Sequence, residues 1–340
     1  MAKIYGTSRV WEEISAKLET VQLKANHPGE ISALLDDCAW KYEQQLGQAM
    51  ESLEDEIVLL EQDVNKEKER VENELAATRE KSSLDIEQSE ATLDFYQHDR
   101  SPLNPIRNSM RTRRETKKLA GLRKNAQEFR DEIEKPLRAK EAELELKKAH
   151  KEQLAKEQCS QMGAQIEFLK TLSGSQELAY ALAEREMLDY LQRLPDHFHV
   201  INHVNLQVDR GFRLQGKWLI RGEIDHLVVG PAGLFAIQVK NWSKQHNKKA
   251  QRTNLGEQIN NAAQLCYLMI KPDYPDVTVR SILAYRGHLP ESENTGFVKV
   301  LPLQEVGAYI SWFTENSLDN NRLQQLVTYL NQLSGQKFAE

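Results

Sequence analysis

The strongest constraint on folding is a proline-free stretch from about Glu30 to Asp94, rich in Glu, Lys, Gln, Leu and Ala. Its apolar side chains alternate spacings of four and three, at Leu46, Met50, Leu53, Ile57, Leu60 and Val64. This spacing is the seam of a left-handed coiled coil. At 1.5 Å per residue, such a helix reaches roughly 100 Å, so it needs a second helix along its length.

A second helical stretch follows a break in the pattern. Pro102 and Pro105 end the first helix, and Leu119, Leu122, Ala126, Phe129 and Ile133 again step by three or four. Helix-forming residues continue to about Leu172, with a kink expected at Pro136. We therefore predict an antiparallel coiled-coil hairpin over residues 30–172. Because two helices bury little apolar surface, we also expect a homodimer through the coil.

The turn end of this hairpin is basic. Residues 100–124 carry nine Lys or Arg side chains and a single acidic one, Glu115. One interpretation is a phosphate-backbone contact, since clustered cations release counterions from nucleic acid. The other is a solvated helix start, and the sequence favours neither. The candidate nucleic-acid-binding residues here are Arg111, Arg113, Arg114, Lys117 and Lys118.

The composition limits the partners and the compartment. A net charge of −6 gives no chain-wide basic field for DNA or an anionic membrane, so any nucleic-acid contact must be local. Three distant cysteines suit neither a disulfide framework nor a structural zinc site. The N-terminus has no apolar signal core, and the longest apolar stretch is too short to span a membrane. We expect a cytoplasmic protein without membrane contact.

Strand-like apolar runs appear only after about Phe198, so the core belongs to the C-terminal half. A short helix is expected at 176–194, strands near 199–207, 212–219, 224–229, 234–240, 277–285 and 297–301, and helices at 255–270, 303–313 and 318–333. This order predicts a mixed α/β domain with helices on both faces of its sheet. We place it at residues 174–316, after an N-terminal segment (1–29) and the hairpin, and before a C-terminal helix and tail (317–340).

Two of these strands carry the polar residues of interest. If Gly230-Pro231-Ala232-Gly233 closes a hairpin, Val229 lies opposite Leu234, and counting back places Asp225 opposite Gln238. Lys240 lies two residues further on and shares their face. Opposed side chains have Cβ atoms roughly 5 Å apart, close enough to hold one small cation. Taken singly, each residue is more simply explained by an ion pair such as Asp225–Lys240. Together, on an apolar hairpin, they indicate a site.

The run from Gly222 to Trp242, GEIDHLVVGPAGLFAIQVKNW, resembles the central motif of the nuclease-related domain family, NERD, within the PD-(D/E)XK nuclease superfamily. Upstream, Ala183-Glu184-Arg185-Glu186-Met187 resembles the family's first-helix segment. Downstream, Gln258 resembles its helix glutamine. The resemblance covers about residues 174–302 and does not extend to the coiled coil.

This resemblance implies a restriction-endonuclease-like core and a phosphodiesterase that acts on nucleic acid, expected to be DNA. Asp225, Gln238 and the backbone carbonyl of Val239 would bind Mg²⁺ or Mn²⁺, while Lys240 would position or activate the attacking water. Glu184 would add a carboxylate from the helix, since Mg²⁺ prefers oxygen ligands. Gln258 would orient a ligand or phosphate, or else cap a buried backbone group.

One position departs from the commonest family pattern, which has Glu or Asp where this chain has Gln238. A neutral amide oxygen attracts Mg²⁺ less strongly than a carboxylate, although Mrr-like members of the superfamily also use Gln. Glu184 is the favoured source of the missing charge, because the hairpin count places Glu223 opposite Lys240. The main hypothesis is a Mg²⁺-dependent nuclease with a coiled-coil arm. The alternative is an inactive nuclease fold that binds nucleic acid or acts as a scaffold.

Overall fold

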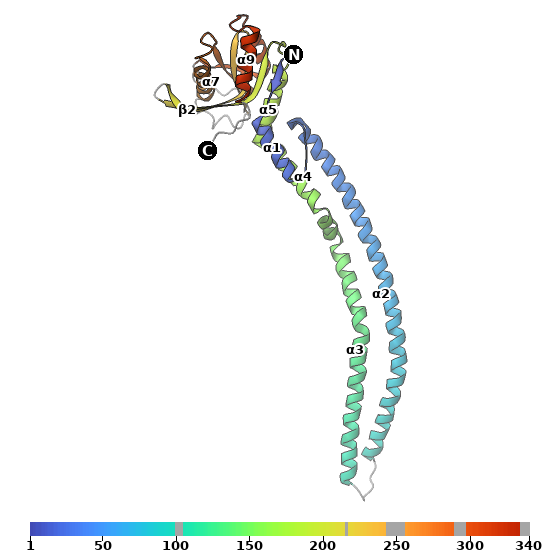
Figure 1. Ribbon diagram of the computed structural model, residues 1–340. Helices are drawn as coiled ribbons and strands as arrows, with labels where there is room; N and C mark the ends of the chain where they lie inside the picture. Colours follow the sequence, from blue (N-terminus) through green and yellow to red (C-terminus); the bar gives the residue numbers. More distant parts are fainter. Residues whose placement is uncertain (99–104, 215–216, 243–255, 289–296, 334–340) are drawn as a thin grey trace. The chain divides into compact units, whose positions relative to one another are not determined.

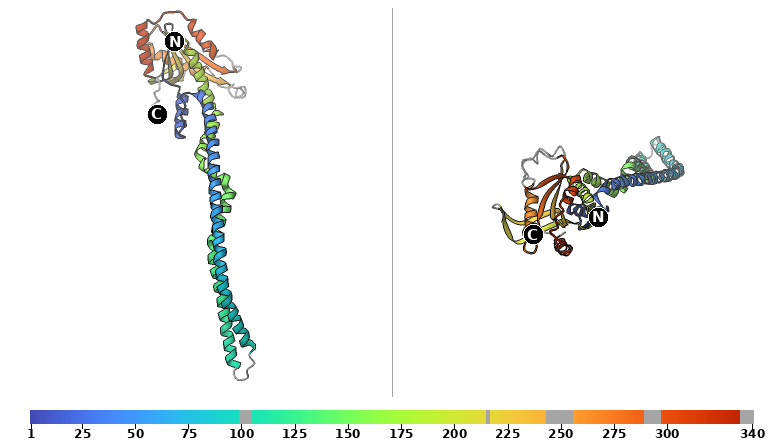
Figure 2. Two further views of the ribbon diagram at one scale, coloured as in Figure 1. Left: turned by 90° about the vertical axis from the view of Figure 1, so that its right-hand side faces the viewer. Right: turned by 90° about the horizontal axis from the view of Figure 1, so that it is seen from above.

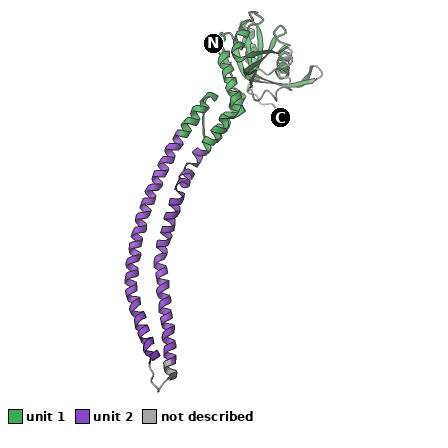
Figure 3. Ribbon diagram, turned by 180° about the vertical axis from the view of Figure 1, so that it is seen from behind, with its two compact units in different colours: residues 1–39, 164–340 green, residues 40–163 purple. Residues whose placement is uncertain are grey.

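The computed structural model describes residues 1–98, 105–214, 217–242, 256–288 and 297–333. The chain divides into two compact units (Figure 3). The sheet unit comprises residues 1–39 and 164–340, and the hairpin unit comprises residues 40–163. The hairpin is therefore inserted into the sequence of the sheet unit. The N-terminal segment, for which the sequence predicted no structure, is part of the sheet unit.

Two long helices, α2 (Ile31–His98) and α3 (Pro105–Gln158), form the hairpin unit between residues 40 and 163. The next helix, α4 (Ser160–Ser173), belongs to the sheet unit from residue 164 on. Figures 1 and 2 show α2 and α3 side by side, and α3 passes through Pro136. Ion pairs join Lys151 to Glu54 at 2.9 Å and Arg123 to Glu90 at 2.6 Å. Because one residue number rises as the other falls, the two helices are antiparallel.

The apolar seam of α2 is used within the chain. Leu53, Val64 and Val71 are buried, and Ile57 and Leu60 are half-buried. At one end of the pair, Ala49 and Leu53 pack with Ala155 and Cys159. Basic side chains of α3 flank the seam, with Lys140 lying 2.8 Å from Asp63. The periodicity of α2 thus selects the face that packs on α3.

The sheet unit has one mixed sheet of six strands in chain order: β1 (Lys3–Tyr5), β2 (His199–Leu214), β3 (Lys217–Gly230), β4 (Gly233–Trp242), β5 (Val279–Gly287) and β6 (Lys299–Pro302). Strands β2, β3 and β4 are antiparallel neighbours, and the other pairings are parallel. The single strand expected over 212–219 is wrong. Phe212 pairs with Leu219 across two strands, so these apolar residues face each other instead of following one another.

Helices cover both faces of the sheet, as expected from the sequence. These are α5 (Gln176–Leu191), α7 (Glu257–Ile270), α8 (Leu303–Ser311) and α9 (Asn320–Asn331), while α1 (Arg9–Thr20) and the 3₁₀ turn η1 (Pro28–Glu30) pack on α5. One apolar cluster joins α5 and α8 to Phe235 and Ile237, and the other joins α7 and α9 to Leu227 and Leu234. None of the described helices combines the length and apolar character needed to cross a membrane.

Candidate functional site

The β3–β4 hairpin has the predicted register. Val229 pairs with Leu234, and Gly230 pairs with Gly233, leaving Pro231 and Ala232 as the turn. Gly233 has a φ of 113°, where a side chain would be strained, and an added Cβ would lie 2.6 Å from the carbonyl oxygen of Thr278. The glycine therefore lets β4 start close to the chain that leads into β5.

Beyond this hairpin, the regular ladder stops just before Asp225. The last pair of β3 with β4 is His226 with Ile237. The β2–β3 ladder also skips the position next to Asp225, where His203 has a φ of 49°. This local interruption frees Asp225 and Gln238 to meet through their side chains instead of through the backbone.

The Asp225 carboxylate accepts a dense set of hydrogen bonds. The Gln238 Nε2 lies 2.7 Å from each carboxylate oxygen, and the backbone N–H of Val239 donates to Oδ2 at 2.7 Å. The hydroxyl of Tyr180, on α5, donates to the same Oδ2 at 2.6 Å. Asp225 is thus held firmly by groups from β4 and α5, as a buried carboxylate must be.

Asp225, Gln238 and Lys240 line one small cleft of about 200 Å³. The remaining lining residues come from several elements: Ser8, Arg9, Val10, Tyr180, Glu184, His203, Glu223 and Gln258. The structure therefore brings together the sequence candidates Asp225, Gln238, Lys240, Glu184 and Gln258. Val239 adjoins this group through its backbone N–H.

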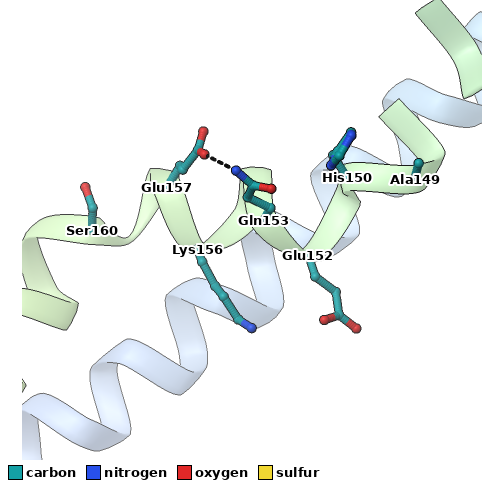
Figure 4. A pocket seen from close by; sticks show the side chains of 7 residues that line it. All are labelled: Ala149, His150, Glu152, Gln153, Lys156, Glu157 and Ser160. Atoms are coloured by element: carbon teal, nitrogen blue, oxygen red, sulfur yellow. Dashed lines mark hydrogen bonds between the residues drawn. The ribbon is translucent and has the colours of Figure 1, made fainter. Parts of the chain in front are cut away.

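A larger hollow, of about 520 Å³, lies along α3 and the first residue of α4 (Figure 4). Its side chains do not converge on a common point, and Gln153 donates to Glu157 of the same helix at 2.9 Å. We attribute it to the open surface of the helices. The smaller cleft, where charged side chains from distant parts of the chain meet, is the candidate site.

The cleft disfavours negative charge on Asp225 and Glu184, whereas the hydrogen bond with His203 lowers the pKa of Glu223. Burial raises the pKa of Asp225 to about 6, with hydrogen bonds from Tyr180 and Val239 opposing the rise. Burial also raises the pKa of Glu184 to about 8, and the negative charge of Asp225 adds to it. The pKa of Tyr180 is raised by burial and then by Asp225, so its hydroxyl stays protonated. A cation bound beside these two buried carboxyl groups would stabilise their charged forms.

Lys240 is half-buried, and its side chain forms no hydrogen bond or ion pair with any residue that the structure describes. Its charge nevertheless lowers the pKa of both Asp225 and Glu184, which places the ammonium near them. The expected pairing of Lys240 with Glu223 is wrong. Glu223 instead lies 3.4 Å from Arg9 Nη1 and 3.4 Å from His203 Nε2, because β2 and the N-terminal segment reach it first.

Five residues of the cleft were missed from the sequence: Ser8, Arg9, Val10, Tyr180 and His203. Tyr180 lies one helical turn before Glu184 on α5, so helical spacing was a usable signal. Ser8 donates from its Oγ to Glu184 Oε2, and Arg9 reaches Glu223. These two residues, and His203, lie in segments whose placement depends on long-range strand pairing, and no local pattern identifies them.

His226 is a packed core residue. Its Nδ1 lies 2.7 Å from Asn202 Oδ1, and burial lowers its pKa to about 4, so the ring is neutral at pH 7. It does not line the cleft.

The oxygen donors of the cleft fit a divalent cation. The Gln238 Oε1 is buried and has no hydrogen-bond partner among the described residues. Beside it stand Asp225 and Glu184. The described segments contain no cluster of three or more His, Cys, Asp or Glu side chains that could hold a metal ion. Mg²⁺ does not require one, since it commonly uses one or two carboxylates and keeps several waters.

Comparison with protein families gives one match. Residues 179–285, from α5 to β5, match the profile of the nuclease-related domain, NERD. The matched segment contains Tyr180, Glu184, Asp225, Gln238 and Lys240, but not Ser8 or Arg9. Searches of curated proteins and of solved structures gave no match. With its mixed sheet and flanking helices, the segment at 179–285 is a nuclease-related domain of the PD-(D/E)XK superfamily, in a chain that also carries a long helical hairpin.

Proposed function

We propose that the protein is a divalent-metal-dependent nuclease that hydrolyses phosphodiester bonds of nucleic acid, with DNA as its substrate. The observation that carries this proposal is the meeting of Asp225, Gln238, Lys240 and Glu184 in one cleft of a nuclease-related domain. A buried acid and a buried amide beside a half-buried amine serve no packing purpose, because each group is costly to desolvate.

In this proposal, Asp225, Gln238 and Glu184 hold Mg²⁺ or Mn²⁺, together with the backbone carbonyl of Val239. A metal held by these residues would polarise a phosphoryl oxygen and lower the pKa of a water. Gln238 now points its Nε2 at Asp225 and leaves Oε1 unpaired. Half a turn about the last side-chain bond exchanges these atoms, which places a second oxygen beside Asp225 and favours a cation between them.

The remaining groups act on charge and position. Lys240 has no partner among the described residues, so its three N–H donors are available to a phosphate oxygen or a water. Tyr180 donates to Asp225 at 2.6 Å and fixes the direction of the carboxylate. Gln258 is exposed at the cleft and is placed to orient a ligand or a phosphate.

We further propose that the basic segment at the start of α3 contacts nucleic-acid phosphates. Arg113, Arg114 and Lys117 are exposed. Lys118 is engaged by Glu115 at 3.1 Å, and the Arg111 guanidinium lies 5.7 Å from the centre of the Tyr96 ring. Arg100 lies outside the described residues. The first three side chains therefore offer the most accessible charge.

A homodimer through the hairpin remains a proposal. The predicted seam packs on α3, so a second copy would have to use other residues, such as Val58 (45% exposed) and Leu59 (64% exposed). Light scattering on the full chain tests this directly: a monomer at micromolar concentration contradicts it. A cytoplasmic location is proposed on the same footing, since Cys38, Cys159 and Cys266 are all free and buried.

Gln238 supports the second candidate function, a nuclease fold that binds nucleic acid without cleaving it. Its neutral oxygen supplies less charge to a metal than a carboxylate. This candidate predicts salt-dependent binding with no cleavage in any divalent metal. A scaffold that recruits another protein through the hairpin predicts neither binding nor cleavage of nucleic acid.

The test is cleavage of plasmid and single-stranded DNA by the full chain with Mg²⁺ or Mn²⁺. We expect cleavage that EDTA abolishes and that falls at least about 100-fold in Asp225→Ala and in Lys240→Ala. Asp209→Ala, at an exposed position on β2, is the control and should cleave normally. Cleavage retained by both site variants contradicts the proposal.

A further inference from the structure

The N-terminal segment supplies residues to the cleft from far outside the nuclease-related domain. Ser8, Arg9 and Val10 line the cleft together with Lys240, although the family match begins only at residue 179. Neither the family match nor the function proposed above assigns a role to them.

Several contacts fix this segment in place. Strand β1 pairs in parallel with β2 through Lys3 and His199, and Asn202 donates its side-chain N–H to the carbonyl oxygen of Gly6 at 3.0 Å. Ser8 caps α1 by accepting from the backbone N–H of Trp11 at 3.3 Å. It also donates to Glu184. The start of α1 is thus tied both to the sheet and to a carboxylate of the cleft.

One edge of the Arg9 guanidinium is hydrogen-bonded within the protein, and the other edge is exposed to solvent. Its Nε donates to Glu13 at 2.8 Å, one helical turn away. Its Nη1 lies 3.4 and 3.5 Å from the two oxygens of Glu223, at the long limit of a hydrogen bond. The side chain is 50% exposed. A guanidinium has five N–H donors in a planar fork, so most of them remain available to a ligand.

The charges of the cleft show which ligand this fork suits. Glu184, Glu223 and Asp225 are acidic, and Arg9 and Lys240 are the two cationic side chains among the lining residues. His203 also contacts Glu223, so that carboxylate keeps a partner when Arg9 turns away from it. A polyanion entering this cleft needs cations at the points where its phosphates come to rest. Arginine matches a phosphate by donating two parallel N–H bonds.

We propose that Arg9 forms a phosphate-binding subsite of this cleft, which takes a backbone phosphate of the nucleic-acid strand beside the one that is cleaved. The subsite rests on the proposed function, since it assumes that a nucleic-acid strand occupies the cleft. The loose contact between Arg9 and Glu223 is exchanged for a bidentate contact with the phosphate, while Glu13 keeps the guanidinium in place.

The experiment measures binding and cleavage separately. Fluorescence anisotropy follows a single-stranded oligonucleotide binding to the full chain, with Ca²⁺ in place of Mg²⁺, over a range of salt concentrations. The variants are Arg9→Gln, which removes the charge, and Lys17→Gln as a matched control. Lys17 is on the same helix and forms an exposed ion pair with Glu177 at 2.5 Å, but it does not line the cleft.

We expect Arg9→Gln to weaken binding and to lower the slope of log K against log salt by about 0.7, the release of one counterion from a single strand. Lys17→Gln should leave that slope unchanged. An unchanged slope in Arg9→Gln overturns the subsite, even if the protein cleaves DNA. A lowered slope without any cleavage supports the subsite and contradicts the nuclease. No binding by the unchanged protein overturns both.

Discussion

Replacing Asp225 by Asn should stabilise the metal-free protein while it disables the site. The carboxylate is buried, and its pKa rises from 3.8 to about 6 in the folded state. Below pH 3.8 it is protonated in both the folded and the unfolded chain and contributes nothing to the pH dependence. As pH rises from 3.8 to about 6, the unfolded chain loses its proton first, so the free energy of unfolding falls.

The size of this effect follows from the two pKa values. A difference of about 2.2 pH units at 1.36 kcal/mol each gives about 3 kcal/mol at pH 7, to order of magnitude. Asn has nearly the shape of a protonated carboxyl group. Its N–H can also donate to the Gln238 Oε1, which has no partner among the described residues. Allowing about 1 kcal/mol for weakened bonds from Tyr180 and Val239 leaves a gain of about 2 kcal/mol.

The assay is urea denaturation followed by tryptophan fluorescence in EDTA, at pH 7 and at pH 3.5. Four of the five tryptophans lie in the sheet unit, so the signal reports mainly on that unit. Asp225→Asn should be more stable than the unchanged protein at pH 7, and about 1 kcal/mol less stable at pH 3.5, where only the weakened bonds remain. Asp209→Asn, exposed on β2, is the matched control and should show no difference at either pH.

Bound metal should make the unchanged protein more stable than Asp225→Asn at pH 7. At 100 times its Kd, Mg²⁺ adds about 2.7 kcal/mol to the unchanged protein and little to the variant. An Asp225→Asn protein that is less stable than the unchanged protein at pH 7 in EDTA would refute the reasoning. A gain of equal size at pH 3.5 would also refute it, because charge would then not be the cause.

Four further predictions concern two glycines, the basic segment of α3 and Gln238. Gly233→Ala should lower the free energy of unfolding by about 2 kcal/mol or more, because φ is 113° and the Thr278 carbonyl is 2.6 Å from the new Cβ. Gly47→Ala, in an open position on α2, should instead raise the free energy of unfolding by roughly 0.5–1 kcal/mol. If denaturation shows that both variants change this free energy in the same direction, both predictions are contradicted. Replacing Arg113, Arg114 and Lys117 by Gln should lower the salt slope of DNA binding by about two to three, whereas no change would show the segment to be only solvated. Gln238→Glu should tighten Mn²⁺ binding in calorimetry and destabilise the metal-free protein, and weaker binding would show that Gln238 does not face the ion.

The predictions that held were those fixed by nearby residues. The seam of α2 follows from its heptad spacing, and the buried positions Leu53 and Val64 fall on it. The register of β3 with β4 follows from the short turn between Gly230 and Gly233, and that register brings Asp225 to Gln238. In both cases the interacting groups are separated by few residues, or repeat at a fixed period.

The features that the sequence did not predict depend on distant contacts. Strand β1 pairs with β2 across almost 200 residues, and this pairing brings Ser8 and Arg9 to the cleft. The same contact explains the error at Glu223, which the hairpin count paired with Lys240 and which instead meets Arg9. Counting along a hairpin treats β3 and β4 as an isolated pair, whereas a third strand and a helix compete for the same carboxylate.

The most direct test of the central claim, that these side chains gather around one divalent ion, is to count bound Mn²⁺ by electron paramagnetic resonance. We predict one ion per cleft in the unchanged protein, lost in Asp225→Ala and retained in Lys240→Ala, since the lysine supplies no ligand atom. Binding that survives in Asp225→Ala, or an unchanged protein that binds no ion at millimolar Mn²⁺, would contradict the claim.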